Sequence, residues 1–345
     1  MLLLLFITLI TWSTVSVRGE YTYNETEARI LSNLAAGAYS TTPSACINRT
    51  LPDDWLLYSK IDTICDEISS TCAAYVLRSD KQKRIILVFR GTKSKEQLLF
   101  EGWKSLNEGR DFYGAGRANR YFFHALRVLW PRIEPLLRDP VFKDYSVTVT
   151  GHSLGGALAS LTALKIALDG LRPSDKLKMV TFGQPRVGDY DLARKHDELV
   201  PNSFRVVHRK DIVPHMPACD KNNSFVVDNS EACSVEPDNV AYHHTTEVWY
   251  PDGMEPGDKY IVCRGPPPGE DMNCSDKLLF DWNNKDEYIH DHRYYFGHKA
   301  CFSHGFFFAT ISEADSSTCS TTKLVWFGLT ALLGCLLFPP QKGEI

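Results

Sequence analysis

A serine flanked by glycines lies between an expected strand and an expected helix. Residues 145–150 are rich in β-branched side chains, and residues 154–168 are small and apolar. Between them the chain reads Gly151-His152-Ser153-Leu154-Gly155, a G-x-S-x-G pattern that in this context is typical of a nucleophile elbow. Such a turn strains the serine backbone and leaves no room for bulk two residues before or after it. It also holds the hydroxyl at a helix N-terminus, where an oxyanion is favoured, so we predict that Ser153 is a nucleophile.

A serine nucleophile needs a base within hydrogen-bond reach and a carboxylate that orients the base. In hydrolases with this elbow the chain order is serine, then Asp or Glu, then histidine. Asp211 follows the expected strand 204–208 and lies beside a proline-fixed turn, which suits the orienting role, although a surface turn would look the same. His152 is next to the nucleophile and is expected to point elsewhere. The remaining candidates for the base are His215, His243, His244, His290 and His292.

Two of these histidines also raise the question of a metal. His290-Asp291-His292 is an H-x-H pair around a carboxylate, but no further ligands follow at metal-site spacing. We therefore predict no metal and no cofactor. The residue pattern alone leaves the choice of base open.

Alternating strands and helices position these residues. Residues 84–89 are a continuous apolar run, which predicts a buried central strand, in a hairpin with residues 73–78. Further strands are expected at 145–150, 178–182 and 204–208, with an edge hairpin from 245–250 and 259–263, and helices are expected at 27–39, 95–106, 117–137, 154–168 and 189–199. This alternation predicts an α/β fold with a mainly parallel sheet. Thr92, Ser153 and Asp211 each follow a strand end, so they can meet at one sheet edge.

In the expected helix over 117–137, the apolar spacing and the proline content point to different structures. Apolar residues recur at helical spacing over 117–137, but Pro131 and Pro135 lie inside the segment. Because proline removes a helix hydrogen bond, we expect a break or kink near Trp130.

Composition is that of an ordinary globular protein. The 345 residues are 43% hydrophobic and 23% charged with a net charge of -4, so no basic excess suggests a nucleic-acid partner. With no repeat and no true linker, we expect one domain over 20–310. Residues 1–19 read as a signal peptide cleaved after Gly19, with a membrane anchor as the alternative, although the apolar run is short for a span.

Cysteines and sequons agree with the secretory pathway. Ten cysteines in an oxidising compartment form disulfides by default. Short local spacing predicts Cys65–Cys72, Cys219–Cys233 and Cys263–Cys274. Acceptor sequons begin at Asn24, Asn48, Asn222 and Asn273. We expect an extracellular or cell-surface glycoprotein.

The segment 311–345 combines a polar spacer with a hydrophobic tail. Leu324 to Phe338 is apolar but short for a membrane span, and small polar residues precede it. Together they are typical of a GPI-anchor signal, and removal after Ser316 or Ser317 would leave eight of the ten cysteines. A short anchor helix and a packed helix are the alternatives, so a membrane tether through this tail is one of the expected partners.

Five segments occur in the order found in a known family: 88–92, 151–159, 182–188, 211–215 and 291–297. They resemble the class 3 lipase family, whose best-known members are secreted fungal triacylglycerol lipases, and the resemblance covers roughly residues 27–301. It implies the α/β-hydrolase fold and a lipid ester substrate at a lipid–water interface. It also implies that His292 is the base, that Asp211 orients it, and that the backbone N–H groups of Thr92 and Leu154 form the oxyanion hole.

The resemblance bears on two further features. The family's long disulfide corresponds to Cys46–Cys301. The family also carries a short lid helix where this chain has residues 94–106, with Leu98, Leu99, Phe100 and Trp103 as its apolar face; an ordinary core helix is the alternative. This chain departs from the fungal enzymes in a longer interval between Asp211 and His292, filled by the cysteine-bearing inserts 219–233 and 263–274.

These observations predict a secreted serine carboxylic ester hydrolase that cleaves acylglycerol ester bonds through an acyl-enzyme. A phospholipase A1 or a feruloyl-type esterase on the same fold is the alternative within hydrolases. A non-catalytic, membrane-tethered recognition protein is the alternative from another class, and the presence of Ser153, Asp211 and His292 together disfavours it. The sequence does not indicate an oligomeric state.

Overall fold

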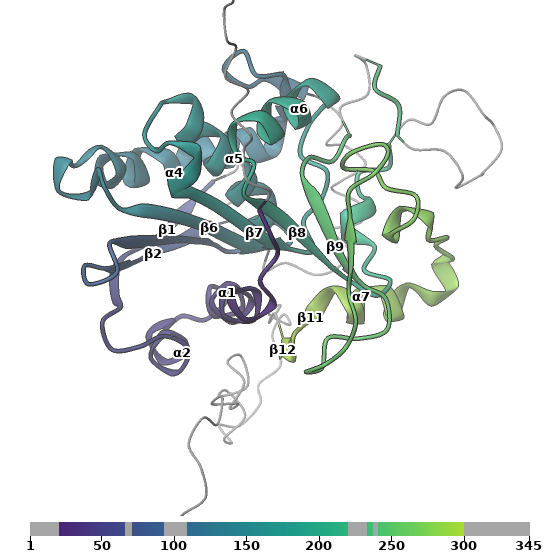
Figure 1. The fold of residues 1–345 in the computed structure, drawn as a ribbon, viewed down its shortest axis with the longest axis horizontal. Coiled ribbons are helices and arrows are strands. Elements are labelled where there is room, and N and C mark those ends of the chain that lie inside the picture. The colour runs from purple at the N-terminus through teal and green to yellow at the C-terminus, as the bar shows by residue number, and fades with distance from the viewer. Residues whose placement is uncertain (1–20, 66–70, 93–108, 220–232, 237–240, 300–345) are drawn as a thin grey trace, which may run out of the picture.

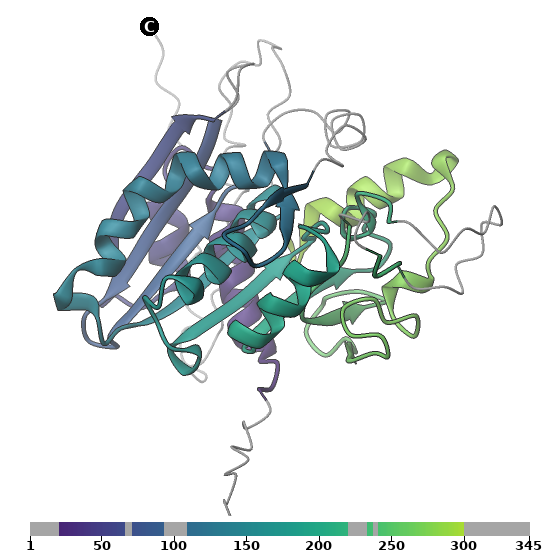
Figure 2. The same cartoon turned by 90° about the horizontal axis from the view of Figure 1, so that it is seen from above.

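The protein is a layered α/β structure built on one large sheet (Figures 1 and 2). In this computed structural model, residues 21–65, 71–92, 109–219, 233–236 and 241–299 are described. The helices are α1 (Glu25–Gly37), α2 (Ser44–Thr50), α4 (Arg120–Arg138), α5 (Leu154–Leu168), α6 (Tyr190–Leu199) and α7 (Lys285–Arg293). The sheet strands are β1 (Leu56–Ile64), β2 (Thr71–Ser79), β3 (Arg84–Phe89), β6 (Ser146–His152), β7 (Leu177–Phe182), β8 (Ser203–His208), β9 (Thr246–Tyr250) and β10 (Ile261–Cys263).

Shorter elements complete the described chain. Two small hairpins are formed by β4 (Gly109–Asp111) with β5 (Arg117–Asn119) and by β11 (Tyr294–Tyr295) with β12 (His298–Lys299). Single 3-10 turns cover Pro140–Phe142, Ser174–Lys176, Val213–His215, Ser275–Lys277 and Trp282–Asn284. No helix in the described residues is both long and apolar enough to cross a membrane.

The large sheet has the strand order β1-β2-β3-β6-β7-β8-β9-β10. The run from β3 to β9 is parallel throughout, while β1, β2 and β10 pair antiparallel with their neighbours. The expected β2–β3 hairpin, the mainly parallel centre and the β9–β10 edge hairpin are therefore confirmed. Because parallel strands all end at the same edge, the residues that follow β3, β6, β7 and β8 come together there.

Helices cover both faces of this sheet. In Figure 1, α4, α5 and α6 lie on one side, and α1 and α2 lie on the other. The apolar run of β3 shows why: Ile85, Leu87 and Phe89 enter the core under α4 and α5, while Ile86 and Val88 enter the core under α1. Burial of each such side chain stabilises the fold by about 1.5–3 kcal/mol. Because β3 is covered on both faces, side chains on both of its faces are apolar.

Of the break or kink expected near Trp130 in the helix over 117–137, the break is wrong. The structure has one helix there, α4, with Pro131 and Pro135 inside it. Both prolines are exposed and lie one helical turn apart, so they share the solvent side, while Phe122 and Ile133 on the opposite side are buried. Backbone carbonyls that lose a partner on the solvent side can bond to water, and the buried apolar face holds the helix together.

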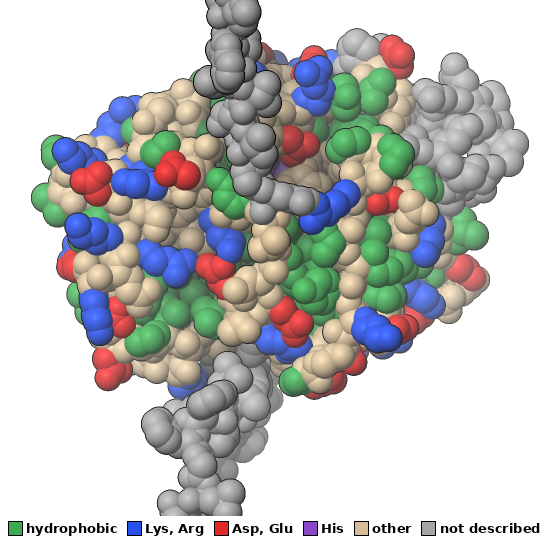
Figure 3. All heavy atoms as spheres, viewed as in Figure 1, with side chains coloured by type: hydrophobic (Ala, Val, Ile, Leu, Met, Phe, Trp, Pro, Cys, Tyr) green, Lys and Arg blue, Asp and Glu red, His purple; other side chains and the backbone are tan. Residues whose placement is uncertain are grey.

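Two elements near the N-terminus were not predicted. The segment around Cys46, expected as a loop, is the short helix α2. The edge strand β1 was missed because Ile61 is its only buried residue, so no alternation of apolar and polar residues marks it. On the face shown in Figure 3, acidic and basic side chains are interspersed and apolar side chains gather over β9.

Candidate active site

The turn between β6 and α5 has the geometry expected of a nucleophile elbow. Ser153 has φ 60° and ψ -130°, a strained conformation for a residue with a side chain. Its N–H donates to the carbonyl of Phe182 at 2.9 Å, which ties the turn to the end of β7. A Cβ on Gly151 would lie 2.3 Å from the Gly155 carbonyl oxygen, and one on Gly155 would lie 2.3 Å from the Phe89 carbonyl oxygen. Both glycines are therefore required by close backbone approach.

The surroundings of Ser153 combine a buried hydroxyl with candidate oxyanion donors. Ser153 is fully buried, and within the described part of the chain its Oγ has no hydrogen-bond partner. Because α5 begins at Leu154, the N–H of that residue has no partner inside the helix. The end of β3 packs against the elbow: a Cβ on Gly91 would lie 3.2 Å from Cβ of Ser153. Thr92 follows directly and is partly exposed.

Asp211 and His292, which are 81 residues apart in sequence, form a buried pair. His292 Nδ1 lies 3.0 Å from Oδ1 and 2.9 Å from Oδ2 of Asp211. Asp211 follows β8, and His292 lies in the last turn of α7. The two side chains are 0% and 2% exposed. The structure thus brings together the carboxylate and histidine that the family resemblance implied, at the sheet edge that also holds Ser153.

Further donors hold the Asp211 carboxylate. The N–H of Val213 donates to Oδ1 at 2.8 Å, and the hydroxyl of Tyr295 donates to Oδ2 at 2.6 Å. Burial alone would raise the pKa of Asp211, but the charge and hydrogen bond of His292, with the hydrogen bonds from Tyr295 and Val213, outweigh burial and lower it. Asp211 is therefore a carboxylate at neutral pH.

The other candidate histidines have different partners. His244 Nε2 lies 2.6 Å from Ser160 Oγ, and His243 Nε2 lies 2.6 Å from the Pro214 carbonyl oxygen. His215 is near Asp276, and the imidazole of His290 is 62% exposed. None of these contacts involves Asp211, so His292 is the histidine that this carboxylate orients among the described residues.

A cluster of three described side chains could at first sight bind a metal. Ligand atoms of His196, Asp197 and His244 lie within 4.8 Å of one another. However, the imidazoles of His196 and His244 stack with centroids 3.8 Å apart and planes 24° apart. A histidine binds metal through an in-plane nitrogen lone pair, and two nearly parallel rings cannot both direct that lone pair at one ion. The arrangement is a packing contact and not a ligand set.

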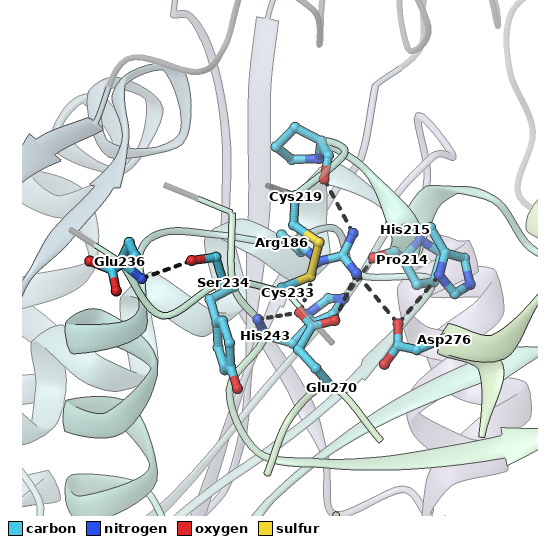
Figure 4. Close-up of a disulfide and its surroundings, with 12 residues drawn as sticks. Arg186, Pro214, His215, Cys219, Cys233, Ser234, Glu236, His243, Glu270 and Asp276 are labelled. Atoms are coloured by element: carbon cyan, nitrogen blue, oxygen red, sulfur yellow. Dashed lines mark hydrogen bonds and ion pairs between the residues drawn. A yellow bond between two sulfur atoms is a disulfide. The ribbon is translucent and has the colours of Figure 1, made fainter. Parts of the chain in front are cut away.

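A buried ion pair supports the turn that carries Asp211 (Figure 4). Arg186, just after β7, binds Glu270 through two hydrogen bonds of 2.8 Å each and lies 3.4 Å from Asp276. Arg186 also donates from its backbone N–H to the Met216 carbonyl at 2.9 Å and from Nη1 to the Pro217 carbonyl at 3.2 Å. The insert that contains Glu270 is thereby fixed to the segment that follows Asp211.

Three of the four expected disulfides are present: Cys65–Cys72, Cys219–Cys233 and Cys263–Cys274. The Cys219–Cys233 bridge lies beside Arg186 (Figure 4). Cys46 is disulfide-bonded, and its expected partner Cys301 lies outside the described residues. The predicted lid residues also lie outside the described residues; they are Leu98, Leu99, Phe100 and Trp103. The sequon residue Asn222 lies outside them as well. The other sequon residues, Asn24, Asn48 and Asn273, are exposed.

Sequence reasoning assigned no role to two residues that touch this site. Tyr295 stands in the segment 291–297 that carried the family resemblance, but nothing there indicated its contact with Asp211. His152 was expected to point elsewhere; its ring instead lies against the ring of His292 at a centroid distance of 4.5 Å.

The chain is similar in sequence to known proteins. The family model Lipase (class 3) matches residues 86–221. The chain is 46% identical to Lipase ZK262.3 of Caenorhabditis elegans over 293 residues, covering 82% of this chain and 83% of that protein. It is 45% identical to the Arabidopsis thaliana protein Phospholipase A1-Igamma2, chloroplastic, over 86 residues, covering 24% and 16% of the two chains.

The fold has a counterpart among solved structures. A crystal structure of lipase from Rhizopus microsporus var. chinensis is similar with a TM-score of 0.64 and 25% identity, covering 81% of this chain and 90% of that chain. Together with the extended match to the nematode protein, this means that the chain belongs to the class 3 lipase family and is a carboxylic ester hydrolase of the lipase type.

Proposed function

We propose that the protein hydrolyses the ester bonds of acylglycerols, with Ser153 as nucleophile, His292 as proton carrier and Asp211 as the group that orients His292. The observation that carries this proposal is the buried Asp211–His292 pair, with His292 Nδ1 2.9 Å from Oδ2, at the sheet edge that holds the strained Ser153. A histidine whose Nδ1 is held by a carboxylate presents Nε2 as a base.

The reaction follows from these roles. Ser153 Oγ attacks the acyl carbon while His292 Nε2 takes its proton, and the same proton passes to the leaving alcohol. Water activated by His292 then hydrolyses the acyl-enzyme. The N–H groups of Thr92 and Leu154 stabilise the oxyanion, and loss of one such donor costs about 3 kcal/mol of transition-state stabilisation.

The buried state of Ser153 bears on how substrate enters. A fully buried Oγ meets a lipid only after neighbouring chain segments move. We propose that residues 94–106, which lie outside the described residues, act as the lid that moves at a lipid surface. Activity should then rise abruptly when a soluble ester exceeds its solubility limit, and a smooth hyperbolic rate curve through that limit would count against this gating.

The nucleophile is tested with a fluorophosphonate probe. Folded wild-type protein should be labelled at Ser153, and Ser153→Ala should lose both labelling and turnover. His292→Ala should be about as severe, and Asp211→Asn milder, because the triad acts as a unit. If folded protein resists labelling, it is a recognition protein and the proposal fails; if His244→Ala abolishes activity and His292→Ala does not, the base is misassigned.

A second substrate class has one observation in its favour. The short segment similar to the Arabidopsis thaliana phospholipase A1 points to phospholipids. Turnover of triolein, a phosphatidylcholine, a monoacylglycerol and a short soluble ester distinguishes the two classes. Preference for phosphatidylcholine over triolein would replace acylglycerol with phospholipid in the proposal.

The proposed compartment is the secretory pathway, with the domain at 20–310 between a signal peptide and the tail at 311–345. The three described disulfides support an oxidising environment. Both terminal segments lie outside the described residues. If the tail is a GPI signal, phosphatidylinositol-specific phospholipase C should release the protein from cells; finding Cys335 in the mature chain would contradict this.

A further inference from the structure

We propose that His152 and Tyr39 are positioning residues for His292, joined by a chain of hydrogen bonds that runs from the Tyr39 hydroxyl through His152 to the main-chain carbonyl of His292. The inference rests on the proposed role of His292 as the base and adds how that base is held. Neither residue contacts the reacting atoms; both act through the backbone and ring of His292.

The chain of contacts is short and buried. His152 Nε2 lies 2.7 Å from the carbonyl oxygen of His292, and His152 Nδ1 lies 2.9 Å from the hydroxyl of Tyr39. Tyr39 and His152 are 5% and 3% exposed. The Tyr39 hydroxyl also approaches Gly91 so closely that a Cβ there would lie 2.1 Å from it. Since water does not compete for these groups, each unpaired partner would be costly.

The direction of each hydrogen bond can be deduced. Burial, followed by the nearby charge of His292, lowers the pKa of His152 to about 3, so its imidazole is neutral at working pH. A neutral imidazole has one donor and one acceptor nitrogen, and a carbonyl can only accept. Nε2 must therefore donate to the carbonyl of His292, and Nδ1 must accept from the Tyr39 hydroxyl. The tautomer of His152 is fixed at both ends.

Ring packing adds a second restraint. The His152 and His292 rings lie 4.5 Å apart with planes tilted by 33°. The base is thus restrained at three points: Nδ1 by Asp211, its carbonyl by His152 Nε2, and one side of its ring by the His152 ring. A neutral His152 also avoids repulsion when His292 becomes an imidazolium in the reaction.

The three parts of the site converge on this pair. His152 precedes the nucleophile Ser153 in the chain, and its side chain holds the base. Tyr39, just beyond α1, packs against Gly91, which precedes the proposed oxyanion residue Thr92: a Cβ on Gly91 would lie 2.1 Å from the Tyr39 hydroxyl. The pair therefore links nucleophile, base and oxyanion donor, whose relative placement governs the rate: a misplacement of about 1 Å can cost on the order of 100-fold.

Substitution of His152 by glutamine or by asparagine provides a matched test. Glutamine at 152 can place its NH₂ where Nε2 stands and keep the bond to the His292 carbonyl; asparagine reaches only the Nδ1 position and loses it. We expect His152→Asn to lower kcat on the order of 100-fold with KM unchanged, and His152→Gln to stay within about tenfold of wild type. His124→Asn, at an exposed position, controls for the substitution itself.

A merely structural role would give a different result. If kcat is equal in the two 152 variants, or if each loss follows its drop in melting temperature, the inference is overturned. Should His152→Asn fail to fold, Tyr39→Phe decides, since it removes a single oxygen: a loss of kcat of about tenfold at constant KM supports the inference, and no loss refutes it.

Failure of this inference is distinguishable from failure of the proposed function. Ser153→Ala and His292→Ala are measured in the same assay. If either turns over substrate like wild type, the proposed function fails. If both are inactive while His152→Asn and Tyr39→Phe behave like wild type, only the positioning role is refuted.

Discussion

The hydroxyl of Tyr295 donates to Oδ2 of Asp211 over 2.6 Å, the same oxygen that lies 2.9 Å from Nδ1 of His292. Tyr295 stands in β11, immediately beyond the helix that carries His292, and its hydroxyl also accepts from the backbone N–H of His208 at 3.3 Å. The end of β8, the carboxylate and the end of α7 are therefore connected through one side chain. The carboxylate keeps its orientation relative to the histidine because Tyr295, which follows His292 closely in the chain, binds both Asp211 and the end of β8 through its hydroxyl.

We predict that Tyr295→Phe lowers kcat about tenfold or more, because hydrogen bonds to charged groups contribute about 1.5–3 kcal/mol and the ring itself is retained. Steady-state kinetics on a soluble ester measure the change. Tyr145→Phe is the matched control, since its hydroxyl donates to Asp80 at 3.0 Å, away from the site. Equal kcat in the two variants would show that the Tyr295 hydroxyl does not support Asp211.

The second prediction concerns the buried pair of Arg186 and Glu270. Replacing Glu270 by leucine leaves a buried guanidinium without its bidentate partner, so the free energy of unfolding should fall by about 3–5 kcal/mol. Adding Arg186→Met removes the guanidinium that has lost its bidentate partner and should restore part of the loss. Urea denaturation of both variants measures the change, and a double variant less stable than Glu270→Leu would contradict the argument.

Much of the fold could be predicted because it depends on local patterns. The continuous apolar run of β3 indicates burial on both faces, and the glycines around Ser153 indicate a turn with no room for side chains. Prediction from local sequence patterns failed where tertiary packing determines the secondary structure. β1 buries only Ile61 and carries no alternation, and α4 continues through Pro131 because its opposite face is packed.

The candidate site was predictable to a different degree. Asp211 could be proposed from its place after a strand, but His292 required the family resemblance, since several histidines fit the chain order. The contacts of His152, Tyr39 and Tyr295 join segments far apart in the sequence. Such contacts follow from how the sheet edge brings loops together, and no local spacing encodes them.

The last prediction concerns acid stability and the buried His196. Burial lowers the pKa of His196 from 6.5 to about 3. The unfolded chain therefore binds a proton between these two pH values that the folded protein does not bind. Stability contributed by the neutral imidazole is fully present above pH 6.5 and is lost as the pH falls toward about 3, at about 1.4 kcal/mol per pH unit.

Replacing His196 by leucine removes this titration while keeping an apolar side chain in the core. The free energy of unfolding of His196→Leu should fall less steeply between about pH 6 and about pH 4 than that of wild type, by about 1.4 kcal/mol per pH unit.

Other buried histidines, including His152, contribute equally to the pH dependence of stability in the variant and in wild type. Any change in packing shifts stability at all pH values alike, so the slope is the measurement that matters. Urea denaturation across this range gives the slope. Parallel slopes for wild type and His196→Leu would mean that His196 is protonated in the folded protein as readily as in the unfolded chain.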